Sequence, residues 1–487
     1  MTDPLIVAVD IGTTAVKAAL FDRSLKSLGH TQRRLRSHHP QPDWVEQDAD
    51  ELFEAVVDAV EELLGKAEGE IVGCGLDHQG ESIVAWDAET GAALSPNVVW
   101  QCKRSAAILA RLEAEGAGEE IKRLTGMPLD PYFSASKLTW LLEEVPAVAE
   151  ARERGRLRLG TLDAFVCDRL GAGSATDPST ASRTQLQRLG SVGWDERLAG
   201  LFGIPVETLP EVTETVGALG ELRHVRWRVP LPLTARLVDQ QAALAGTGCV
   251  EAGMSKATYG TGVFVLAHVG DDAPEPRGGL LPTVAWTIDG RTSYALDGGV
   301  FTAGALLEWL SGDLGLAPDP PALSALARTV EDSAGVRVLP ALAGIGAPWW
   351  VPDARAAITG LTAAVRPAHV ARAALEAIAW RVADVLETVG AQVEVESLRV
   401  DGGLTREPLL LQLQADTTGV PVEPMEADAT VQGAALLAAV GAGLFATPAD
   451  GAALVQPGAR VEPASDPAWR VAEHARWKRF VKLAAQL

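Results

Sequence analysis

Cysteine, histidine and tyrosine are scarce in this chain, which has four Cys, eight His and three Tyr among 487 residues. The four cysteines stand far apart and form no Cys-x-x-Cys pair, which argues against a disulfide framework and is typical of reduced thiols in a cytosolic protein. Only His38 and His39 are close in sequence, and adjacent side chains point apart on a strand or a helix. The sequence therefore predicts no structural zinc site.

Basic residues are few relative to acidic ones. The chain has 42 Lys and Arg against 64 Asp and Glu, which gives a formal net charge of −22. Nucleic acids and anionic membranes are bound through patches of Lys and Arg, so we expect neither as a partner. A phosphate-bearing ligand remains compatible with this charge, because backbone N–H groups and one or two cations can hold phosphates.

Long apolar segments are missing as well. The N-terminus carries Asp3 where a signal peptide needs basic residues, so no signal peptide is expected. The longest stretch of small apolar residues, 433–446, has about 14 residues, whereas a membrane span needs about 20, and we interpret it as a buried helix. With 47% hydrophobic and 22% charged residues, the composition is typical of a soluble globular protein with two or three domains. We expect a cytoplasmic location.

Three common catalytic motifs do not occur in the sequence: the P-loop GxxxxGK[ST], the zinc-protease motif HExxH and the hydrolase motif GxSxG. What the chain has instead is a set of aspartates and Gly-Thr turns at the ends of apolar runs. Such turns offer N–H groups and hydroxyls to phosphates, and a nearby carboxylate can bind hydrated Mg²⁺.

The first of these turns follows an apolar run at residues 6–9, which predicts a buried strand that ends at Asp10. Gly12, Thr13 and Thr14 then form a turn before a return strand that carries Lys17. Asp10 could hold Mg²⁺ and Lys17 could neutralise a phosphate. The alternative is a plain hairpin whose aspartate stabilises the turn.

A similar strand, turn and strand recurs at residues 257–266, around Gly260-Thr261-Gly262. The two copies lie about half a chain apart, which suggests a duplicated domain with one turn from each copy facing a shared cleft. Coincidence is the alternative, because Gly-Thr turns are common. We place the boundary near residues 245–250 and predict domains at residues 1–246 and 247–487.

Two more aspartates follow apolar strands. Asp239 ends the strand at 237–238 and opens a helix, a position where α/β folds bind ligands, although an aspartate there could also cap the helix. Asp401-Gly402-Gly403 lies between a strand at 398–400 and a helix at 408–418. Its glycines allow a nucleotide to approach the backbone, or they simply make a tight turn.

Helical spacing of apolar residues predicts a long helix at 48–66 and an amphipathic C-terminal helix at 469–487. The apolar positions of the C-terminal helix include Trp469, Val471, Trp477 and Val481. Its opposite side is basic, and we expect it to pack onto the acidic body of the protein.

Taken in chain order, these features resemble the FGGY carbohydrate kinases along almost the whole chain, and most of all the glycerol kinases of that family. The resemblance implies an α/β, actin/hexokinase-like (ribonuclease H-like) duplicated fold with two domains flanking a nucleotide cleft. The segments that carry it are TGMPLDPYFS (125–134), YFSASKLTWLLEE (132–144), ATDPSTASRT (175–184), LFGIPVETLPEV (201–212), DQQAAL (239–244), TYGTGVF (258–264), GAPWWVPDARAAITGLT (346–362) and LRVDGG (398–403).

The resemblance also implies cofactors and roles: ATP and Mg²⁺ as cofactors, with Asp239 as the general base and Asp10 as the water-mediated Mg²⁺ ligand. Lys17 stands where these kinases usually carry Arg. Glu308 and Glu407 depart from the amides that are usual at their positions. The implied nucleotide-binding residues are Thr13, Thr14, Lys17, Gly260, Thr261, Gly304, Glu308, Gly402, Gly403 and Glu407.

The implied substrate is a small polyol or sugar, and glycerol, converted to glycerol 3-phosphate, is the expected one. Gly80 departs from the pattern because glycerol kinases carry Arg there. The space could admit a longer polyol, with His78 as a replacement donor, so erythritol or xylulose remains an alternative. A non-catalytic sensor is a second alternative, and a chaperone-like ATPase is less favoured. The implied substrate residues are Gly80, Glu81, Trp100, Tyr132, Asp239, Gln240 and Phe264.

Some glycerol kinases bind fructose 1,6-bisphosphate through a Gly-Gly loop and an Arg shortly before the catalytic Asp. The corresponding stretch here is GALGELRHVRWRVP (217–230), with Pro230 at the position of that Arg. We therefore predict no inhibition by this effector. A homodimer or a homotetramer is compatible with the resemblance, and the sequence does not decide between them.

Overall fold

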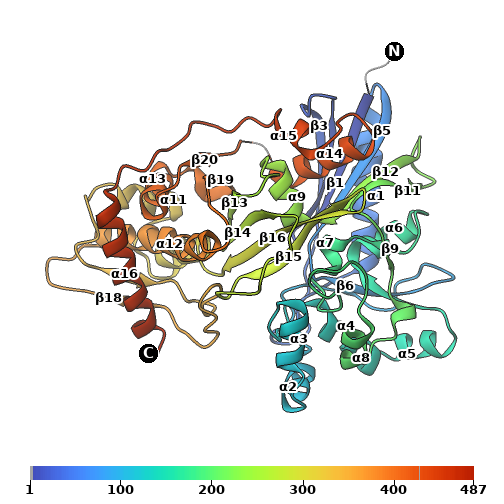
Figure 1. Ribbon diagram of the computed structural model, residues 1–487, viewed down its shortest axis with the longest axis horizontal. Coiled ribbons are helices and arrows are strands. Elements are labelled where there is room, and N and C mark those ends of the chain that lie inside the picture. The colour runs from blue at the N-terminus through green and yellow to red at the C-terminus, as the bar shows by residue number, and fades with distance from the viewer. Residues whose placement is uncertain (1–3, 427, 487) are drawn as a thin grey trace.

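The computed structural model describes residues 4–426 and 428–486. It consists of an N-terminal half, up to residue 246, and a C-terminal half, from residue 254. Each half is built on a six-stranded mixed sheet. In Figure 1 the N-terminal sheet stands at the upper right and the C-terminal sheet lies towards the left.

The N-terminal sheet has the strand order β3-β2-β1-β5-β12-β11. Strand β2 pairs antiparallel with β1 and β3, β5 and β12 extend the sheet parallel to β1, and β11 closes it antiparallel to β12. Residues 6–9 are buried on both faces, as the continuous apolar run predicts. The strands span β1 Pro4–Ile11, β2 Ala15–Phe21, β3 Ser27–Arg34, β5 Glu70–His78, β11 Val216–Leu222 and β12 Leu231–Val238.

The C-terminal sheet repeats this topology, with the order β15-β16-β14-β13-β19-β20. Strands β13, β14, β16, β19 and β20 correspond to β1, β2, β3, β5 and β12, with the same antiparallel and parallel pairings. The predicted duplication is therefore visible as two copies of one sheet, and the fold is the predicted actin/hexokinase-like one. The strands span β13 Met254–Tyr259, β14 Val263–Gly270, β15 Leu281–Ile288, β16 Arg291–Val300, β19 Ser397–Asp401 and β20 Val422–Pro424.

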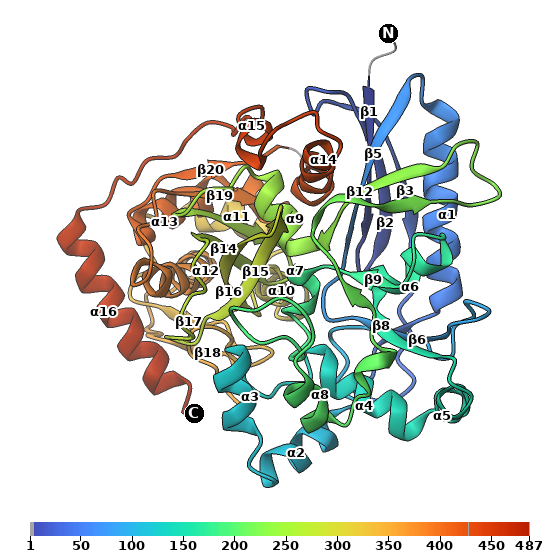
Figure 2. The same ribbon diagram turned by 45° about the vertical axis from the view of Figure 1, so that its right-hand side comes forward.

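A smaller part of the N-terminal half lies below its main sheet in both views (Figures 1 and 2). It contains a four-stranded sheet of order β4-β7-β6-β8 and the two-stranded pair β9-β10, surrounded by short helices. Its elements are β4 Glu46–Gln47, β6 Ile83–Asp87, β7 Asn97–Val98, α2 Ala106–Ala114, α3 Gly118–Thr125, α4 Ser134–Glu144, α5 Pro146–Glu153, β8 Leu157–Thr161, α6 Leu162–Arg169, β9 Ala175–Thr176, α7 Pro178–Ala181, α8 Glu196–Phe202, the 3₁₀ helix Val206–Thr208 and β10 Glu211–Val212.

Helix α1 (Ala49–Lys66) covers one face of the N-terminal sheet and begins as predicted, because Asp48 accepts hydrogen bonds from the N–H groups of Asp50 and Glu51. The other helices belong to the C-terminal half or lie between the halves. They span α9 Asp239–Gly246, α10 Gly304–Glu308, a π-helical turn Trp309–Asp313, α11 Pro320–Ala327, α12 Pro367–Gly390, the 3₁₀ helix Gly403–Arg406, α13 Pro408–Thr418, α14 Ala429–Gly441, α15 Pro448–Ala452 and α16 Pro467–Ala484, with the short pair β17 Arg337–Leu339 and β18 Ala357–Thr359.

Helices α9 and α14 lie between the two sheets (Figure 2), and α14 packs onto β1, β5 and β12 of the opposite half. Glycine permits this close approach. A Cβ on Gly433 would lie 1.7 Å from the carbonyl oxygen of Ala242, and one on Gly246 would lie 1.8 Å from that of Ala429. The apolar segment 433–446 thus contributes to a buried helix, as predicted. No helix within the described ranges is long and apolar enough to cross a membrane.

The C-terminal helix α16 differs in part from the prediction. Trp477 and Val481 are buried, whereas Trp469 is 46% exposed and Val471 is 70% exposed. The buried face is instead shared with a polar residue, His474, whose Nε2 lies 2.8 Å from Oδ1 of Asp384. Asp384 also accepts from the indole N–H of Trp477, and these two bonds set the rotation of the helix.

Candidate active site

Three aromatic side chains from both halves form one cluster. Trp100 follows β7, Tyr132 precedes α4, and Phe264 comes from β14 of the C-terminal half. The ring of Trp100 meets those of Tyr132 and Phe264 edge to face, with centroids 5.6 Å and 6.5 Å apart. The structure thus brings together the three aromatic residues that the sequence assigned to the substrate. Such rings bind the carbon skeleton of a small polyol and exclude water from it.

Asp239 stands half-buried at the junction of β12 and α9. Its Oδ1 accepts from the N–H of the next residue, Gln240, at 2.7 Å, and it makes no capping bond to the helix. The alternative of a helix cap is therefore not what the structure shows. Burial, followed by the charges of Asp10 and Glu81, raises the pKa of Asp239 to about 7. A carboxyl group with a pKa near neutrality suits a general base.

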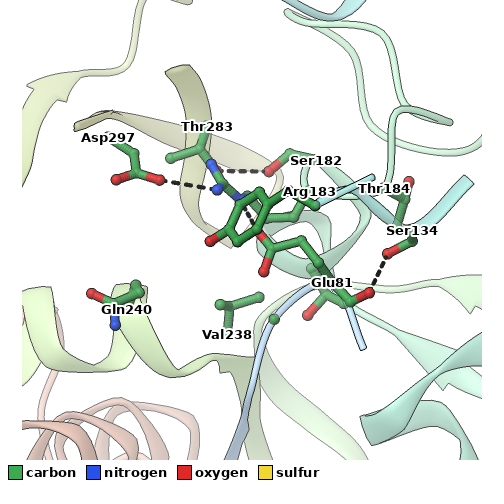
Figure 3. Close-up of polar contacts among 12 residues, drawn as sticks. Glu81, Ser134, Ser182, Arg183, Thr184, Val238, Gln240, Thr283 and Asp297 are labelled. Carbon is green, nitrogen blue, oxygen red and sulfur yellow. Dashed lines mark hydrogen bonds and ion pairs between the residues drawn. The ribbon is translucent and has the colours of Figure 1, made fainter. Parts of the chain in front are cut away.

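Glu81 lies near enough to Asp239 for its charge to raise the pKa of Asp239, and its backbone has a positive φ of 56°. Its side chain is 5% exposed, and its Oε1 accepts from Nε of Arg183 at 2.6 Å. Figure 3 shows this contact beside Val238 and Gln240. Burial raises the pKa of Glu81, and Arg183 opposes this rise.

Gln240 is held by a lysine that the sequence did not single out. The ammonium group of Lys256, on β13, donates to Oε1 of Gln240 at 2.6 Å and to the hydroxyl of Thr258 at 3.0 Å. Because the amide oxygen is taken, the NH₂ group of Gln240 is left to donate to a substrate oxygen. Lys256 is buried, and burial lowers its pKa, against the charges of Asp401 and Asp239.

The expectation that His78 replaces a donor beside Gly80 is wrong. A Cβ on Gly80 would lie 3.0 Å from Cγ1 of Val238, so a side chain at position 80 would press on Val238. His78 is fully buried, with Nδ1 3.0 Å from the carbonyl oxygen of Gln79 and Nε2 3.0 Å from the hydroxyl of Thr180. Both ring nitrogens are occupied, and His78 therefore has no donor to offer to a substrate.

Asp10 lies one residue before the end of β1, which continues to Ile11 rather than ending at Asp10, and it pairs across the hairpin with Lys17. The Lys17 ammonium lies 3.3 Å from Oδ2 of Asp10 and 2.7 Å from Oδ2 of Asp428, just before α14. Burial works against the charge of Lys17, but the two carboxylates raise its pKa above the ordinary value. Burial raises the pKa of Asp10, while Lys17 lowers it.

A second carboxylate, Asp77, lies near the end of the neighbouring parallel strand β5, in register with Asp10. Asp77 is fully buried, and neither of its oxygens has a hydrogen-bond partner among the described residues. Hard cations such as Mg²⁺ prefer carboxylate oxygens and water. The Asp10–Asp77 pair is therefore a donor set that fits a hydrated magnesium ion.

The second Gly-Thr turn, between β13 and β14, has an exposed tip at Gly260 and Thr261. The N–H of Gly304 at the start of α10 donates to the carbonyl oxygen of Gly260 at 3.0 Å. A Cβ on Gly304 would lie 2.6 Å from that oxygen, so this position requires glycine. The turn and α10 thus form one unit on the C-terminal side of the cleft.

A cavity of about 700 Å³ lies between the halves and extends from Lys17 to Asp401, Gly402 and Gly403. Gly402 has a φ of 96°, and a Cβ there would lie 2.3 Å from the carbonyl oxygen of Tyr259. The two interpretations of the Gly402-Gly403 turn are therefore compatible. The turn needs glycine at position 402, and it also borders a cavity large enough for a nucleotide.

The remaining predicted nucleotide residues lie outside the lining of this cavity. The side chain of Thr13 accepts from the indole N–H of Trp100 at 3.0 Å, and Thr14 and Glu308 are exposed. Both carboxylate oxygens of Glu407 accept from Nη1 of Arg328, at 2.7 and 2.6 Å, and Oε1 also accepts from the N–H of Leu409 at the start of α13. Glu407 therefore has a structural partner in place.

Four charged residues of the cleft were missed as site residues by reasoning from the sequence: Asp77, Arg183, Lys256 and Asp297. Asp77 could have been found, because it lies near the end of a second apolar strand in the same way as Asp10 does in the first. Arg183 belongs to the family segment ATDPSTASRT, but nothing in the sequence indicates its charged partner. Asp297 lies on β16 of the C-terminal half and meets Arg183 only in the folded protein.

A duplicated α/β fold with a Gly-Thr turn in each half and a half-buried aspartate of raised pKa at the end of a central strand is the architecture of the sugar and polyol kinases. Two family models match the chain, the N-terminal domain of the FGGY family of carbohydrate kinases over residues 5–246 and its C-terminal domain over residues 255–442. The chain belongs to the FGGY family of carbohydrate kinases.

Curated relatives agree with this assignment. A glycerol kinase of Carboxydothermus hydrogenoformans is 39% identical over 100% of this chain and 99% of its own. One from Halorhodospira halophila is 41% identical over 91% of this chain and 90% of its own. Among solved structures, the glycerol kinase of Plasmodium falciparum with ADP has a TM-score of 0.93 at 27% identity, over 99% of this chain and 98% of its own. A ligand-bound xylulose kinase of Lactobacillus acidophilus, with a TM-score of 0.90 at 21% identity and coverage of 99% and 98%, shares the fold.

Proposed function

We propose that this protein transfers the γ-phosphoryl group of ATP to a terminal hydroxyl of glycerol and so forms glycerol 3-phosphate. The observation that carries the proposal is the position of Asp239, whose half-buried carboxylate is near enough to both Asp10 and Glu81 for their charges to raise its pKa. Relatives named glycerol kinase, 39–41% identical over nearly the whole chain, support glycerol as the substrate.

In this reaction Asp239 accepts the proton of the attacking hydroxyl. One positioned carboxylate of this kind contributes roughly 10²–10⁴-fold to the rate. Glu81 and the NH₂ group of Gln240 orient the polyol so that one hydroxyl faces Asp239, while Trp100 and Phe264 cover its carbon atoms. Orientation matters because a reacting hydroxyl held in line with the phosphate needs no further ordering in the transition state.

On the nucleotide side, Lys17 neutralises charge on the transferring phosphoryl group, and the N–H groups of the two Gly-Thr turns bind phosphate oxygens. Asp10, with Asp77 beside it, would hold Mg²⁺ through water, and the ion would supply further charge neutralisation at the phosphates. Gly402 and Gly403 would let the adenosine approach the wall of the 700 Å³ cavity. Closure of the two halves would exclude water, so that the polyol receives the phosphoryl group.

Another polyol or a ketose is the second candidate, and Gly80 favours it, because the charged donor that glycerol kinases use at this place is missing. Val238 fills the first part of the space at Gly80, which weakens the case for a longer substrate. A non-catalytic sensor would have no need for Asp239 with a raised pKa beside an intact Asp10–Lys17 pair.

A substrate panel tests the proposal. Purified protein is incubated with ATP, Mg²⁺ and each of glycerol, erythritol, xylitol, D-xylulose and gluconate, and ADP release is followed. We expect glycerol to give the highest kcat/KM. ADP release with a longer polyol or sugar and none with glycerol would contradict the glycerol assignment, and no ADP release with any of them would support the sensor.

The matched pair Asp239→Asn and Asp272→Asn tests the base. Asp272 is an exposed acid in the loop after β14 and serves as the control. Asp239→Asn should lower kcat by roughly 10²–10⁴-fold while calorimetry still detects ADP binding, and Asp272→Asn should change neither. Unchanged turnover in Asp239→Asn would remove Asp239 from the mechanism.

A further inference from the structure

Arg183 lies in the loop after α7, in the N-terminal half, and is enclosed between two carboxylates. Its guanidinium donates through Nε to Glu81 at 2.6 Å and lies with Nη2 2.9 Å from Oδ2 of Asp297, on β16 of the C-terminal half. The side chain of Arg183 is 4% exposed, and those of its two partners are 5% and 7% exposed. This ion pair therefore spans the two halves of the molecule inside the cleft (Figure 3).

The position of Arg183 is fixed by its neighbours. The preceding hydroxyl, that of Ser182, lies 2.9 Å from the hydroxyl of Thr283 and accepts from the N–H of Val284 at 3.1 Å, both on β15. Above the guanidinium stands the ring of Tyr132, whose centroid is 5.6 Å from Cζ. Arg183 is thus held from both halves and faces an aromatic residue of the proposed polyol pocket.

Glu81 depends on this arginine. A carboxylate buried to this extent is stable in its ionised form only when it is paired, because the interior does not solvate its charge. The charge of Lys137 also helps to keep the pKa of Glu81 down, but the ammonium group does not bond to Glu81. It donates instead to the carbonyl oxygens of Pro131 and Tyr132, at 3.0 and 2.6 Å. Among the described residues, Arg183 is the cation that donates directly to Glu81.

We propose that Arg183 is a positioning residue for the polyol substrate. It holds Glu81 as an oriented acceptor for substrate hydroxyls, and through Asp297 it ties this acceptor to the C-terminal half. Position 80, which precedes Glu81 in the sequence, carries only glycine and so has no charged side chain. In this chain the guanidinium next to Glu81 comes instead from Arg183, which belongs to a different segment. The inference rests on the proposed function, in that Glu81 must be a substrate residue.

The effect is measurable as a double-mutant cycle in the full-length protein. Arg183→Gln removes the charge, Glu81→Gln removes the acceptor, and the double variant removes both. A hydrogen bond to a charged group corresponds to roughly a 10–100-fold change in affinity, so Arg183→Gln should raise the KM for glycerol by about that factor. The KM for ATP should change little, because Arg183 lies away from the nucleotide cavity. In the Glu81→Gln background the added effect of Arg183→Gln should fall below about 3-fold.

Three further variants separate positioning from general damage. Arg183→Lys keeps the positive charge but loses the planar, bidentate donor geometry of the guanidinium. Its affinity for glycerol should therefore lie between those of the wild type and of Arg183→Gln. Asp297→Asn removes only the ion pair between Arg183 and the C-terminal half. It should raise the KM for glycerol by less than Arg183→Gln does. The control is Arg188→Gln, which removes a 46% exposed arginine paired with Asp195 and should leave both KM values unchanged.

The outcomes are distinct. Non-additivity of Arg183→Gln and Glu81→Gln in glycerol KM, with partial rescue by Arg183→Lys, supports the proposal. Additive effects, or equal losses for glycerol and ATP, would overturn it. If wild-type protein phosphorylates another polyol instead of glycerol, the proposed substrate fails, and the same cycle run with that polyol still decides the role of Arg183. Thermal unfolding confirms that each variant is folded, and Arg183→Gln/Asp297→Asn, which also removes the charge of Asp297, replaces Arg183→Gln if the single variant unfolds.

Discussion

At the residue scale, the cleft holds more acidic than basic groups. Asp10, Asp77, Glu81, Asp239 and Asp297 contribute carboxylates to one connected set, in which the pKa values of Asp77, Glu81 and Asp239 are raised by burial and by neighbouring carboxylates. The cations that act on them include Lys17, Lys137, Arg183 and Lys256. Burial, together with this excess of negative charge, explains why Asp239 is a stronger base than an exposed aspartate.

The raised pKa of Asp239 predicts the pH dependence of the reaction. Below a pH of about 7 the carboxyl group is protonated and cannot accept a proton from the polyol; above it the carboxylate is available. We therefore expect kcat/KM for the polyol to rise with pH through about 7 and then to level off. Initial rates measured with saturating ATP across this range test the prediction. A profile that is flat across neutral pH would contradict it, and the residual activity of Asp239→Asn should show no such rise.

At the element scale, the two Gly-Thr hairpins show how duplication creates the site. Both turns follow the first strand of a six-stranded sheet, β1 in one half and β13 in the other. Asp10 and Lys17 are present in the first copy only, whereas the second copy contributes the backbone of Gly260 and Thr261 and the contact with α10. The two hairpins therefore share one backbone geometry, but the first carries the charged side chains and the second contributes backbone groups.

The contact between α9 and α14 predicts a stability effect. Gly433→Ala places a Cβ 1.7 Å from the backbone oxygen of Ala242, so the two helices must separate. We expect a loss of at least about 1–3 kcal/mol of unfolding free energy, as for overpacked cores. The matched control is Gly65→Ala in α1, where a Cβ meets nothing within 4 Å and should add about 0.5–1 kcal/mol.

Chemical denaturation of both variants provides the measurement. The substitutions are chemically identical and both lie in helices, so opposite signs can come only from the surroundings. A Gly433→Ala variant as stable as the wild type would show that the two helices can move apart at little cost.

The loop between β11 and β12 bears on regulation. Arg226 is paired with Asp58 and Glu61 of α1, and its Nη1 lies 3.2 Å from Glu54. The indole N–H of Trp227 donates to the carbonyl oxygen of Val57 at 3.1 Å. Arg226 and Trp227 of this loop are thus bound to α1, Arg223 is paired with Glu221 of β11, and Pro230 carries no charge.

We predict that fructose 1,6-bisphosphate leaves the activity unchanged. The reason is that Arg226, which could bind a phosphate, is already neutralised by three acidic side chains of α1. A titration of the effector against initial rate at fixed ATP and glycerol tests this. A dose-dependent loss of activity would show that the loop binds the effector by other groups.

At the scale of the whole molecule, the formal charge of −22 does not describe the site. The nucleotide cavity is lined by Lys17 and Arg406 as well as by Asp401, Glu426 and Asp428, so an anionic ligand meets two local cations there in spite of the acidic surroundings. Other acidic residues lie far from the cavity on exposed faces, such as Asp50, Glu51 and Glu54 of α1.

The two-half architecture predicts closure on binding. The proposed polyol residues come from both halves, Glu81 and Trp100 from one and Phe264 from the other. Ligands that contact both halves favour the closed arrangement, because only that arrangement makes all contacts at once. Small-angle X-ray scattering should show a smaller radius of gyration with ATP, Mg²⁺ and glycerol present together than with any one alone.

Asp239→Asn is the form to use in that measurement, because it should bind all ligands without turning them over. An unchanged radius of gyration with the full ligand set would argue that the cleft is already closed in the free protein.

The sequence by itself determined the elements and the fold. Buried strands, the Gly-Thr turns and the helix that opens at Asp239 were all predictable, because apolar periodicity and glycine turns are local properties of the chain. The family segments, distributed in order over the whole length, gave the duplicated architecture. The aromatic cluster of Trp100, Tyr132 and Phe264 also followed from them.

Only the tertiary structure decided which charges meet. It placed Arg183 between Glu81 and Asp297, occupied both nitrogens of His78, and filled the start of the space at Gly80 with Val238. None of these contacts has a local signature, because each joins segments that are distant along the chain. The physical reason is that a buried charge is stable only beside its partner, and that partner is selected by packing in three dimensions rather than by spacing in the sequence.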